Sequence, residues 1–231
     1  MILLNQHGLR RLINLPLIKN KSDIEETVSI YESLRQSYIE NGYREYIFVK
    51  NDRLTDFLSV VYGLPFAALY TVIYSLVHRT IPDFGFYIFI ISVVLLYITT
   101  PIHEALHGLG WSRFLKNGYK SIYIYLPKGI SDAYCHCAEP LSFRQYGFGN
   151  IVPLIFLSII PAIAAVLTSS AVLFYFSLFN AFGCGSDIAN TILAFKNKDK
   201  IILDYPIECG FTAYKKSRNI RLFLYTEIIL F

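Results

Sequence analysis

Three long stretches of the chain contain no charged residue. Asp, Glu, Lys and Arg are all absent from Phe57 to Val77, Phe84 to Ile102 and Gln145 to Ser186. A transmembrane helix needs about 20 apolar residues to cross roughly 30 Å of hydrocarbon, so each of the first two stretches predicts one span. The third is roughly twice as long, and Thr168-Ser169-Ser170 near its middle supplies a polar turn between two helices. The pattern therefore predicts four spans, over about residues 57–77, 84–107, 150–167 and 170–195.

Composition favours this interpretation over the alternative of buried helices in a soluble protein. The chain is 54% hydrophobic and its mean hydropathy is +0.43, more than a soluble domain of 231 residues needs. Core helices of a soluble protein usually keep a charged face, and these segments have none. The predicted fold class is an α-helical polytopic membrane protein with about four transmembrane helices, a small cytoplasmic β-hairpin and a short N-terminal α/β segment.

The positions of Lys and Arg predict how the spans are oriented. Basic residues fall within 10–53, 113–144 and 196–221, and only Arg79 lies on the opposite side. The positive-inside rule then places both termini and the central loop in the cytoplasm of a multi-pass cell-membrane protein. The start of the chain shows no secretory signal, so the first span is expected to direct insertion. The net charge of +4 lies mostly beside the spans, which predicts contact with the lipid bilayer and not with nucleic acid.

The segments outside the spans predict small cytoplasmic elements. Residues 1–56 form a predicted N-terminal segment, in which apolar residues at helical spacing lead to a helix end at Asn41-Gly42. Tyr43 to Val49 then alternates as a strand does. Residues 57–195 form the predicted membrane core, and residues 196–231 form a C-terminal tail. In the tail, Tyr205 to Tyr214 predicts an extended segment, and the apolar Asn219 to Phe231 is expected on the membrane surface or on the soluble part.

The central loop is expected to hold the hairpin. Tyr119 to Leu126 and Asp132 to Ala138 predict two strands, and Pro127-Lys128-Gly129 predicts the turn between them. An exposed sheet edge can hold an extended peptide by strand addition. The other interpretation is that the hairpin only covers the membrane mouth.

The motif His103-Glu104-x-x-His107 closes the second predicted span. Positions four apart lie on one face of a helix, so both imidazoles can bind one zinc ion. Glu104 lies next to that face, where its carboxylate can take a proton from a water molecule that zinc activates near neutral pH. Ionisable side chains near hydrocarbon are costly and usually functional. The alternative is a helix end whose His and Glu simply face water.

Asp187 is the candidate third zinc ligand. It ends the charge-free run in the fourth predicted span, within Gly183-Cys-Gly-Ser-Asp187, where glycines allow close approach of backbones. An isolated carboxylate there is costly unless it meets a cation or a metal. The alternative is that Asp187 caps the helix or forms a salt bridge with Lys196 or Lys198.

Cys135-His136-Cys137 is a second possible metal patch. On a strand the two thiols share one face and the imidazole takes the other, so the three side chains do not easily bind one tetrahedral ion. Cys184 and Cys209 complete the cysteines. All four are expected in or next to the cytoplasm, where disulfides are rare, and are predicted to be thiols. His7 and His78 are expected to be ordinary interfacial residues.

Four features follow one another in the order of a known family: Pro101-Ile-His-Glu-Ala-Leu-His107, the cysteine-containing loop, Ser186-Asp187 and Leu203-Asp-Tyr-Pro-Ile-Glu-Cys-Gly-Phe211. Over roughly Leu58 to Tyr214 the chain resembles the bacterial putative zincin peptidases, which are similar in plan to intramembrane metalloproteases of the site-two-protease kind. The resemblance implies a zinc ion held by His103, His107 and Asp187, with Glu104 as the catalytic base. The chain departs from the better-known intramembrane proteases, whose distal Asp lies in an Asn-Pro-x-x-x-x-Asp-Gly-like segment, because Ile188 and Ala189 follow Asp187.

These patterns predict a membrane-embedded zinc metalloprotease that hydrolyses peptide bonds in membrane or membrane-proximal proteins. The main alternative is a non-catalytic membrane protein that binds a partner and keeps a structural or vestigial metal site. A small transporter fits less well, because the costly residues gather at one end instead of lining a path through the membrane.

Overall fold

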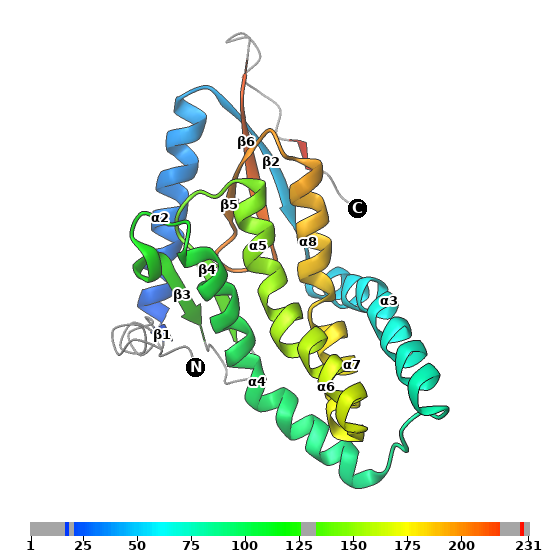
Figure 1. Cartoon of the computed structure of the whole chain (residues 1–231). Helices are drawn as coiled ribbons and strands as arrows, with labels where there is room; N and C mark the ends of the chain where they lie inside the picture. Colours follow the sequence, from blue (N-terminus) through cyan, green and yellow to red (C-terminus); the bar gives the residue numbers. More distant parts are fainter. Residues whose placement is uncertain (1–16, 19–20, 126–132, 218–226, 229–231) are drawn as a thin grey trace.

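The strands lie in one half of the molecule in Figure 1, and the other half consists of helices alone. The computed structural model describes residues 17–18, 21–125, 133–217 and 227–228. Helices α3, α4, α6 and α7 make one half, two small sheets and α2 make the other, and α5 and α8 join the two. The helices are α2 (Lys21–Glu40), α3 (Asp52–His78), α4 (Phe86–Ser112), α5 (Phe143–Pro153), α6 (Ile160–Thr168), α7 (Ala171–Gly183) and α8 (Gly185–Lys196), with a π-helical turn at Leu154–Ile159 between α5 and α6 and a 3-10 turn at Gly118–Ser121.

Three helical segments are long and apolar enough to cross a membrane: Asp52–His78, Phe86–Ser112 and Phe143–Thr168. Helices α7 and α8 would supply a fourth crossing if they count as one span. The predicted break after Thr168 is confirmed, because Ser169 adopts a left-handed conformation and the Ser170 side chain caps α7. The structure therefore has the apolar helices that the charge-free stretches predict.

The span predicted over 170–195 is not one straight helix. It breaks at Cys184, and its two parts are bent by 44°. A Cβ atom on Gly185 would lie 2.1 Å from the Ser59 carbonyl oxygen of α3, so only glycine lets α8 begin against that helix. Gly183, in contrast, has open space around it. As a result Asp187 lies in the first turn of α8, where a helix end favours a carboxylate.

The predicted hairpin is confirmed, within a three-stranded sheet. Strands β3 (Ile122–Tyr125) and β4 (Tyr134–Cys137) pair in antiparallel register, and β1 (Leu17–Ile18) adds to β3 in parallel. The predicted turn at Pro127 lies outside the described residues, as does His7.

The second sheet joins segments from opposite ends of the chain. Its order is β5-β6-β2-β7, in which β2 (Tyr43–Val49) matches the predicted strand and pairs along its whole length with β6 (Gly210–Lys216). Strand β5 (Ile201–Asp204) was not predicted, and the extended segment predicted from Tyr205 becomes a strand only at Gly210. Of the predicted apolar end, the structure describes only β7 (Glu227–Ile228), which pairs with β2.

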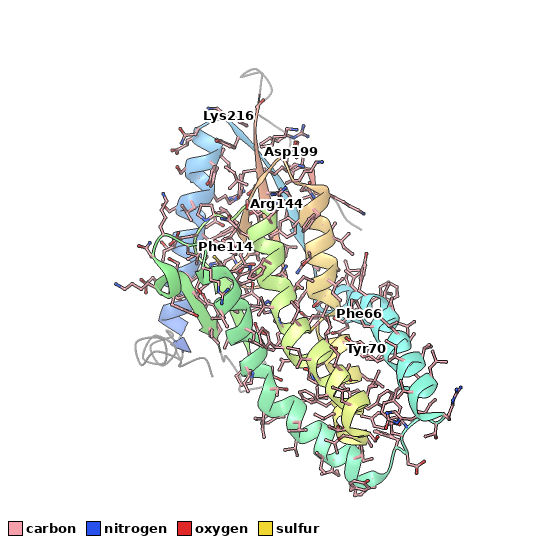
Figure 2. All side chains as sticks on the ribbon, in the orientation of Figure 1. Phe66, Tyr70, Phe114, Arg144, Asp199 and Lys216 are labelled. Carbon is pink, nitrogen blue, oxygen red and sulfur yellow. The ribbon has the colours of Figure 1, made fainter. Side chains whose placement is uncertain are left out.

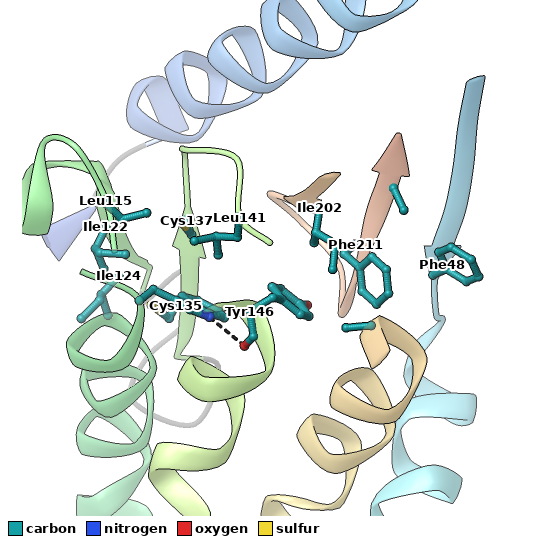
Figure 3. Close-up of a cluster of buried hydrophobic side chains, with 13 residues drawn as sticks. Phe48, Leu115, Ile122, Ile124, Cys135, Cys137, Leu141, Tyr146, Ile202 and Phe211 are labelled. Atoms are coloured by element: carbon teal, nitrogen blue, oxygen red, sulfur yellow. Dashed lines mark hydrogen bonds between the residues drawn. The ribbon is translucent and has the colours of Figure 1, made fainter. Parts of the chain in front are cut away.

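One hydrophobic cluster packs both sheets onto the ends of α4 and α5 (Figure 3). Ile124 and Cys135 reach it from the hairpin, and Phe48 and Phe211 reach it from the second sheet. Trp111 Nε1 donates to the Tyr146 carbonyl at 3.0 Å, the dashed line in Figure 3, which ties α4 to α5 inside this cluster. The sheets are thus fixed against the part of α4 that carries the His-Glu-x-x-His motif.

Helix α2 packs on the second sheet. The Tyr31 hydroxyl lies 2.9 Å from Thr212 Oγ1, and Arg35 Nε donates to Glu45 Oε1 at 2.7 Å. Both contacts reach strands that carry the sheet, β6 and β2. The predicted apolar face of α2 therefore has its partner within the chain.

Charge follows the same division (Figure 2). Phe66 and Tyr70 lie in the helical half, where they pack with Ala162 and Ala181, whereas the labelled charged residues Arg144, Asp199 and Lys216 lie in the strand-bearing half. The candidate metal centre lies where the two halves meet.

Candidate metal centre

Close packing fixes the helix that carries the motif. A Cβ atom on Gly108 would lie 2.7 Å from Ile122 Cγ2 of the hairpin, and one on Gly110 would lie 2.6 Å from Gly149 Cα of α5. The two glycines thus let α4 touch β3 and α5, and the helix continues past them to Ser112. The motif is held between the hairpin and α5.

A backbone carbonyl sets the proton position of His107. Its Nδ1 lies 3.0 Å from the carbonyl oxygen of Gly149. A carbonyl oxygen can only accept a hydrogen bond, so Nδ1 is the donor and carries the proton. In the neutral ring Nε2 then keeps a free lone pair, which is the state a metal requires.

Asp187 meets both histidines. Its Oδ2 lies 3.2 Å from His103 Nε2 and 3.6 Å from His107 Nε2, and the two Nε2 atoms are 3.0 Å apart. Its ion-pair partners among the described residues are these two imidazoles and neither Lys196 nor Lys198. Helices α4 and α8 therefore bring together the three side chains that the sequence predicts as ligands.

The geometry of the three atoms fits a zinc ion. Zinc with ligands at about 2.0–2.1 Å in tetrahedral arrangement separates neighbouring ligand atoms by about 3.3 Å, close to the three distances here. Asp187 Oδ2 is buried and finds no hydrogen-bond partner in the described part of the chain, although a buried carboxylate oxygen normally has one. No other group of three potential ligands converges in this way in residues 21–125 and 133–217. Two imidazoles and a carboxylate suit zinc.

Glu104 lies in the same cavity as these ligands. The cavity has a volume of about 200 Å³, and α3, α4, α5, α7, α8 and the strand-bearing half all contribute to its wall. Glu104 is half-buried and lines the cavity together with Cys135 of β4. The lining residues are Thr55, His103, Glu104, His107, Trp111, Tyr134, Cys135, Tyr146, Asn150, Gly183, Ser186, Asp187, Asn190, Asp204, Cys209 and Gly210.

Asp204 ties the hairpin to the second sheet above this cavity. Its Oδ2 accepts from His136 Nδ1 and from the Cys137 backbone N–H, both at 3.1 Å. Its Oδ1 accepts from the Tyr146 hydroxyl at 3.4 Å. Each carboxylate oxygen therefore has a donor, and His136 reaches Asp204 instead of a metal.

The cysteines of the hairpin do not form a second site with His136. Cys135 and Cys137 are buried in the hydrophobic cluster, whereas His136 is directed at Asp204, as the alternation of a strand requires. Burial raises the pKa of both thiols well above its usual value. Thiols that stay protonated are poor metal ligands.

Sequence reasoning missed Asn190 of the cavity wall and Lys50, which contacts it. Lys50 Nζ donates to Asn190 Oδ1, and Asn190 Nδ2 donates to Cys209 Sγ at 3.4 Å. Burial lowers the pKa of Lys50, which comes from the end of β2. Asn150 was missed as well. An amide within an otherwise apolar helix is costly, and this cost was the signal that could have found Asn150.

A His-Glu-x-x-His helix with a third ligand from a separate helix defines the donor arrangement of zincin-type metallopeptidases. The comparison with protein families agrees: residues 96–202 match the family described as "putative zincin peptidase". The predicted resemblance is thereby confirmed, over a shorter range than the Leu58 to Tyr214 inferred from the sequence. The match includes Glu104 and the three ligand candidates, and it ends before Asp204. No curated protein and no solved structure matches the chain.

Proposed function

We propose that this protein is a membrane-embedded zinc metallopeptidase that hydrolyses peptide bonds in membrane or membrane-proximal proteins. One observation carries the proposal: His103, His107 and Asp187 direct three ligand atoms to one point, and Glu104 lines the same cavity. The family match over 96–202 supports the class of enzyme.

The surface of the helical half supports the membrane location. Large apolar side chains are exposed along α3 and α4, among them Leu64, Leu76, Phe86 and Val94. A soluble protein rarely exposes so continuous an apolar surface. His103 lies about 26 Å along α4 from Phe86 at 1.5 Å per residue, so a bilayer around this half would leave the metal centre near one edge of the hydrocarbon. By the positive-inside rule, the basic segments on the strand-bearing side support a cytoplasmic location for that edge and for both termini.

Each residue of the centre has a distinct role in the proposed hydrolysis. His103, His107 and Asp187 would hold zinc, which supplies Lewis-acid chemistry when bound. Glu104 accepts a proton from the attacking water molecule and returns it to the departing amine nitrogen. The Gly149 carbonyl keeps His107 in the tautomer that can bind a metal.

The hairpin acts as a cover for the site more than as an edge for strand addition. Strand β4 pairs with β3 on one side, and on its other side the Cys137 N–H already donates to Asp204. A substrate strand would have to displace this carboxylate to pair there. This arrangement favours a substrate that enters the cavity beneath β4.

The alternative function, a non-catalytic protein with a structural metal, fits less well. Structural zinc sites are closed by four protein ligands, whereas catalytic sites have three and keep one position open. Three ligands converge here among the described residues, and the adjoining cavity leaves room for water and a substrate.

Substitution of Glu104 tests the proposal. Glu104→Gln keeps the size of the side chain but cannot take up a proton, so we expect unchanged zinc content and at least about 100-fold slower proteolysis. Zinc is measured by elemental analysis of the purified chain, and substrates are sought as membrane proteins that accumulate uncut in cells carrying this variant. Glu32→Gln, on the exposed side of α2, is the matched control. Equal proteolysis by wild type and Glu104→Gln would refute the mechanism.

A further inference from the structure

Asn150 presents an unused hydrogen-bond donor to the cavity. Its side chain is 3% exposed and lines the cavity with Glu104 and the two histidines. Its Nδ2 is buried and has no hydrogen-bond partner among the described residues. A buried amide without an acceptor has lost its hydrogen bonds to water with nothing in return, so native structures rarely keep one. The donor is therefore available to a molecule that enters the cavity.

The other side-chain N–H donors of the wall are already engaged. Besides the two histidines, the described residues that contribute such donors are Trp111, Asn150 and Asn190. Trp111 Nε1 donates to the Tyr146 carbonyl, and Asn190 Nδ2 donates to Cys209 Sγ. The Tyr146 hydroxyl lies near the Asn150 amide, but the contact lacks the geometry of a hydrogen bond. Within the described part of the chain, Asn150 is thus the one amide of the wall whose N–H groups are free.

The backbone fixes Asn150 beside the metal centre. Asn150 directly follows Gly149, whose carbonyl accepts from His107 Nδ1 at 3.0 Å. At this point α5 touches α4, because a Cβ atom on Gly149 would lie 2.1 Å from the Trp111 ring. Two links therefore fix the Asn150 amide relative to His107. One is the hydrogen bond of His107 to the neighbouring residue Gly149, and the other is the Gly149–Trp111 contact, which leaves no room for a methyl group.

We infer that Asn150 is a catalytic residue that donates a hydrogen bond from Nδ2 to the carbonyl oxygen of the scissile peptide bond. This inference rests on the proposed peptidase function. When water attacks the carbonyl carbon, a C–O bond forms, the π electrons move to the carbonyl oxygen and Glu104 takes the proton. The oxygen then carries negative charge, which a preorganised donor stabilises more strongly than it stabilises the neutral carbonyl. The amide keeps both its protons throughout.

The test compares Asn150→Leu with wild type on the zinc-loaded full-length chain in detergent micelles. Cleavage is followed with a pool of quenched fluorescent decapeptides, and affinity is measured for a phosphinic pseudo-dipeptide, whose tetrahedral anion imitates the charged oxygen. We expect kcat to fall about 100- to 1000-fold with little change in KM. The phosphinic compound should bind about 10- to 100-fold more weakly, with unchanged zinc content.

Asn180→Leu is the matched control. Asn180 is also a buried asparagine in an apolar helix, but its Nδ2 donates to the Phe176 carbonyl at 2.9 Å and it does not line the cavity. We expect its kcat and its affinity for the phosphinic compound to equal those of wild type. Asn150→Asp, which keeps the shape and replaces the donor by an acceptor, should reproduce the loss if the leucine variant does not fold.

The outcomes separate this inference from the proposed function. Wild-type kcat and phosphinic affinity in a zinc-loaded Asn150 variant, while Glu104→Gln is inactive, would overturn the role of Asn150 alone. Loss of zinc from the Asn150 variants would also overturn it, because the residue would then support the ligands and not the substrate. Absence of zinc binding and cleavage in wild type would overturn the proposed function and this inference together.

Discussion

Two aspartates of this molecule each meet histidine, and they differ in what surrounds their oxygens. Asp204 accepts from His136, from a backbone N–H and from a tyrosine hydroxyl, so both of its oxygens are occupied by protein donors. Asp187 faces two imidazoles, yet its Oδ2 lacks a hydrogen bond. Both carboxylates line the same cavity.

This difference separates a structural contact from a ligand site. The donors around Asp204 come from β4 and α5 and hold two sheets and a helix together. Around Asp187, the Asp187 oxygen and the neutral His107 Nε2 are both acceptors once His107 Nδ1 has donated to Gly149. Acceptors that converge without donors repel one another unless a cation lies between them. Proximity of His and Asp alone therefore says little, whereas the direction of each hydrogen bond distinguishes the two sites.

The matched variants Asp187→Asn and Asp204→Asn test the difference between the two aspartates most directly. Loss of a residue that only supports a metal ligand lowers zinc affinity roughly 10- to 100-fold. Asp187→Asn removes a ligand itself, so its zinc affinity should fall by more, and proteolysis should be lost with it. Asp204→Asn should keep stoichiometric zinc, since Asp204 contacts no ligand. Competition with a fluorescent chelator measures both affinities. Equal zinc affinity in the two variants would remove the distinction.

Zinc should stabilise only chains with an intact centre. Free zinc at 100 times its dissociation constant stabilises a folded protein by about 2.7 kcal/mol, so chelation should lower the melting temperature of wild type. His103→Ala should melt at the same temperature with zinc or with chelator, because the three ligand atoms no longer converge. A thermal shift assay in detergent follows both proteins. A chelator effect of equal size in the variant would place the stabilising zinc elsewhere.

Loss of His136 should affect stability and leave zinc binding intact. His136→Leu removes one of the donors on Asp204 Oδ2, and a buried carboxylate that loses a donor costs about 1–3 kcal/mol. Denaturation in mixed micelles measures the free energy of unfolding. His78→Leu is the control: it removes one contact to the Val166 carbonyl and should cost about 0.5–1.5 kcal/mol. Zinc loss from His136→Leu would show that the hairpin residue belongs to the metal centre.

Local patterns predicted the elements that depend on local sequence. The charge-free stretches predicted the apolar helices, and alternation predicted the strand from Tyr43 to Val49. Two strand-like segments around a turn predicted the hairpin. Helical spacing predicted the common face of His103 and His107. Asp187 could be singled out because a carboxylate at the end of an apolar run needs a partner. The structure shows that Asp187 meets His103 and His107.

Non-local contacts account for the rest. The pairing of Tyr46 with Ala213 joins segments far apart in sequence, and nothing in either strand specifies the other. The bend at Cys184 depends on contact between Gly185 and Ser59 of another helix. The free amide of Asn150 is visible only when every acceptor around it has a position.

The pairing of β2 with β6 also sets the order of events during biosynthesis. The ligands and Glu104 leave the ribosome before Asp204, Cys209 and Gly210, which complete the cavity wall. Translation must therefore pass Lys216, the end of β6, before the early strand β2 has its neighbour and the pocket is enclosed. If the protein cleaves membrane proteins as proposed, a nascent chain in which α4 and α8 have already formed still lacks an enclosed site and would not cut neighbouring proteins early.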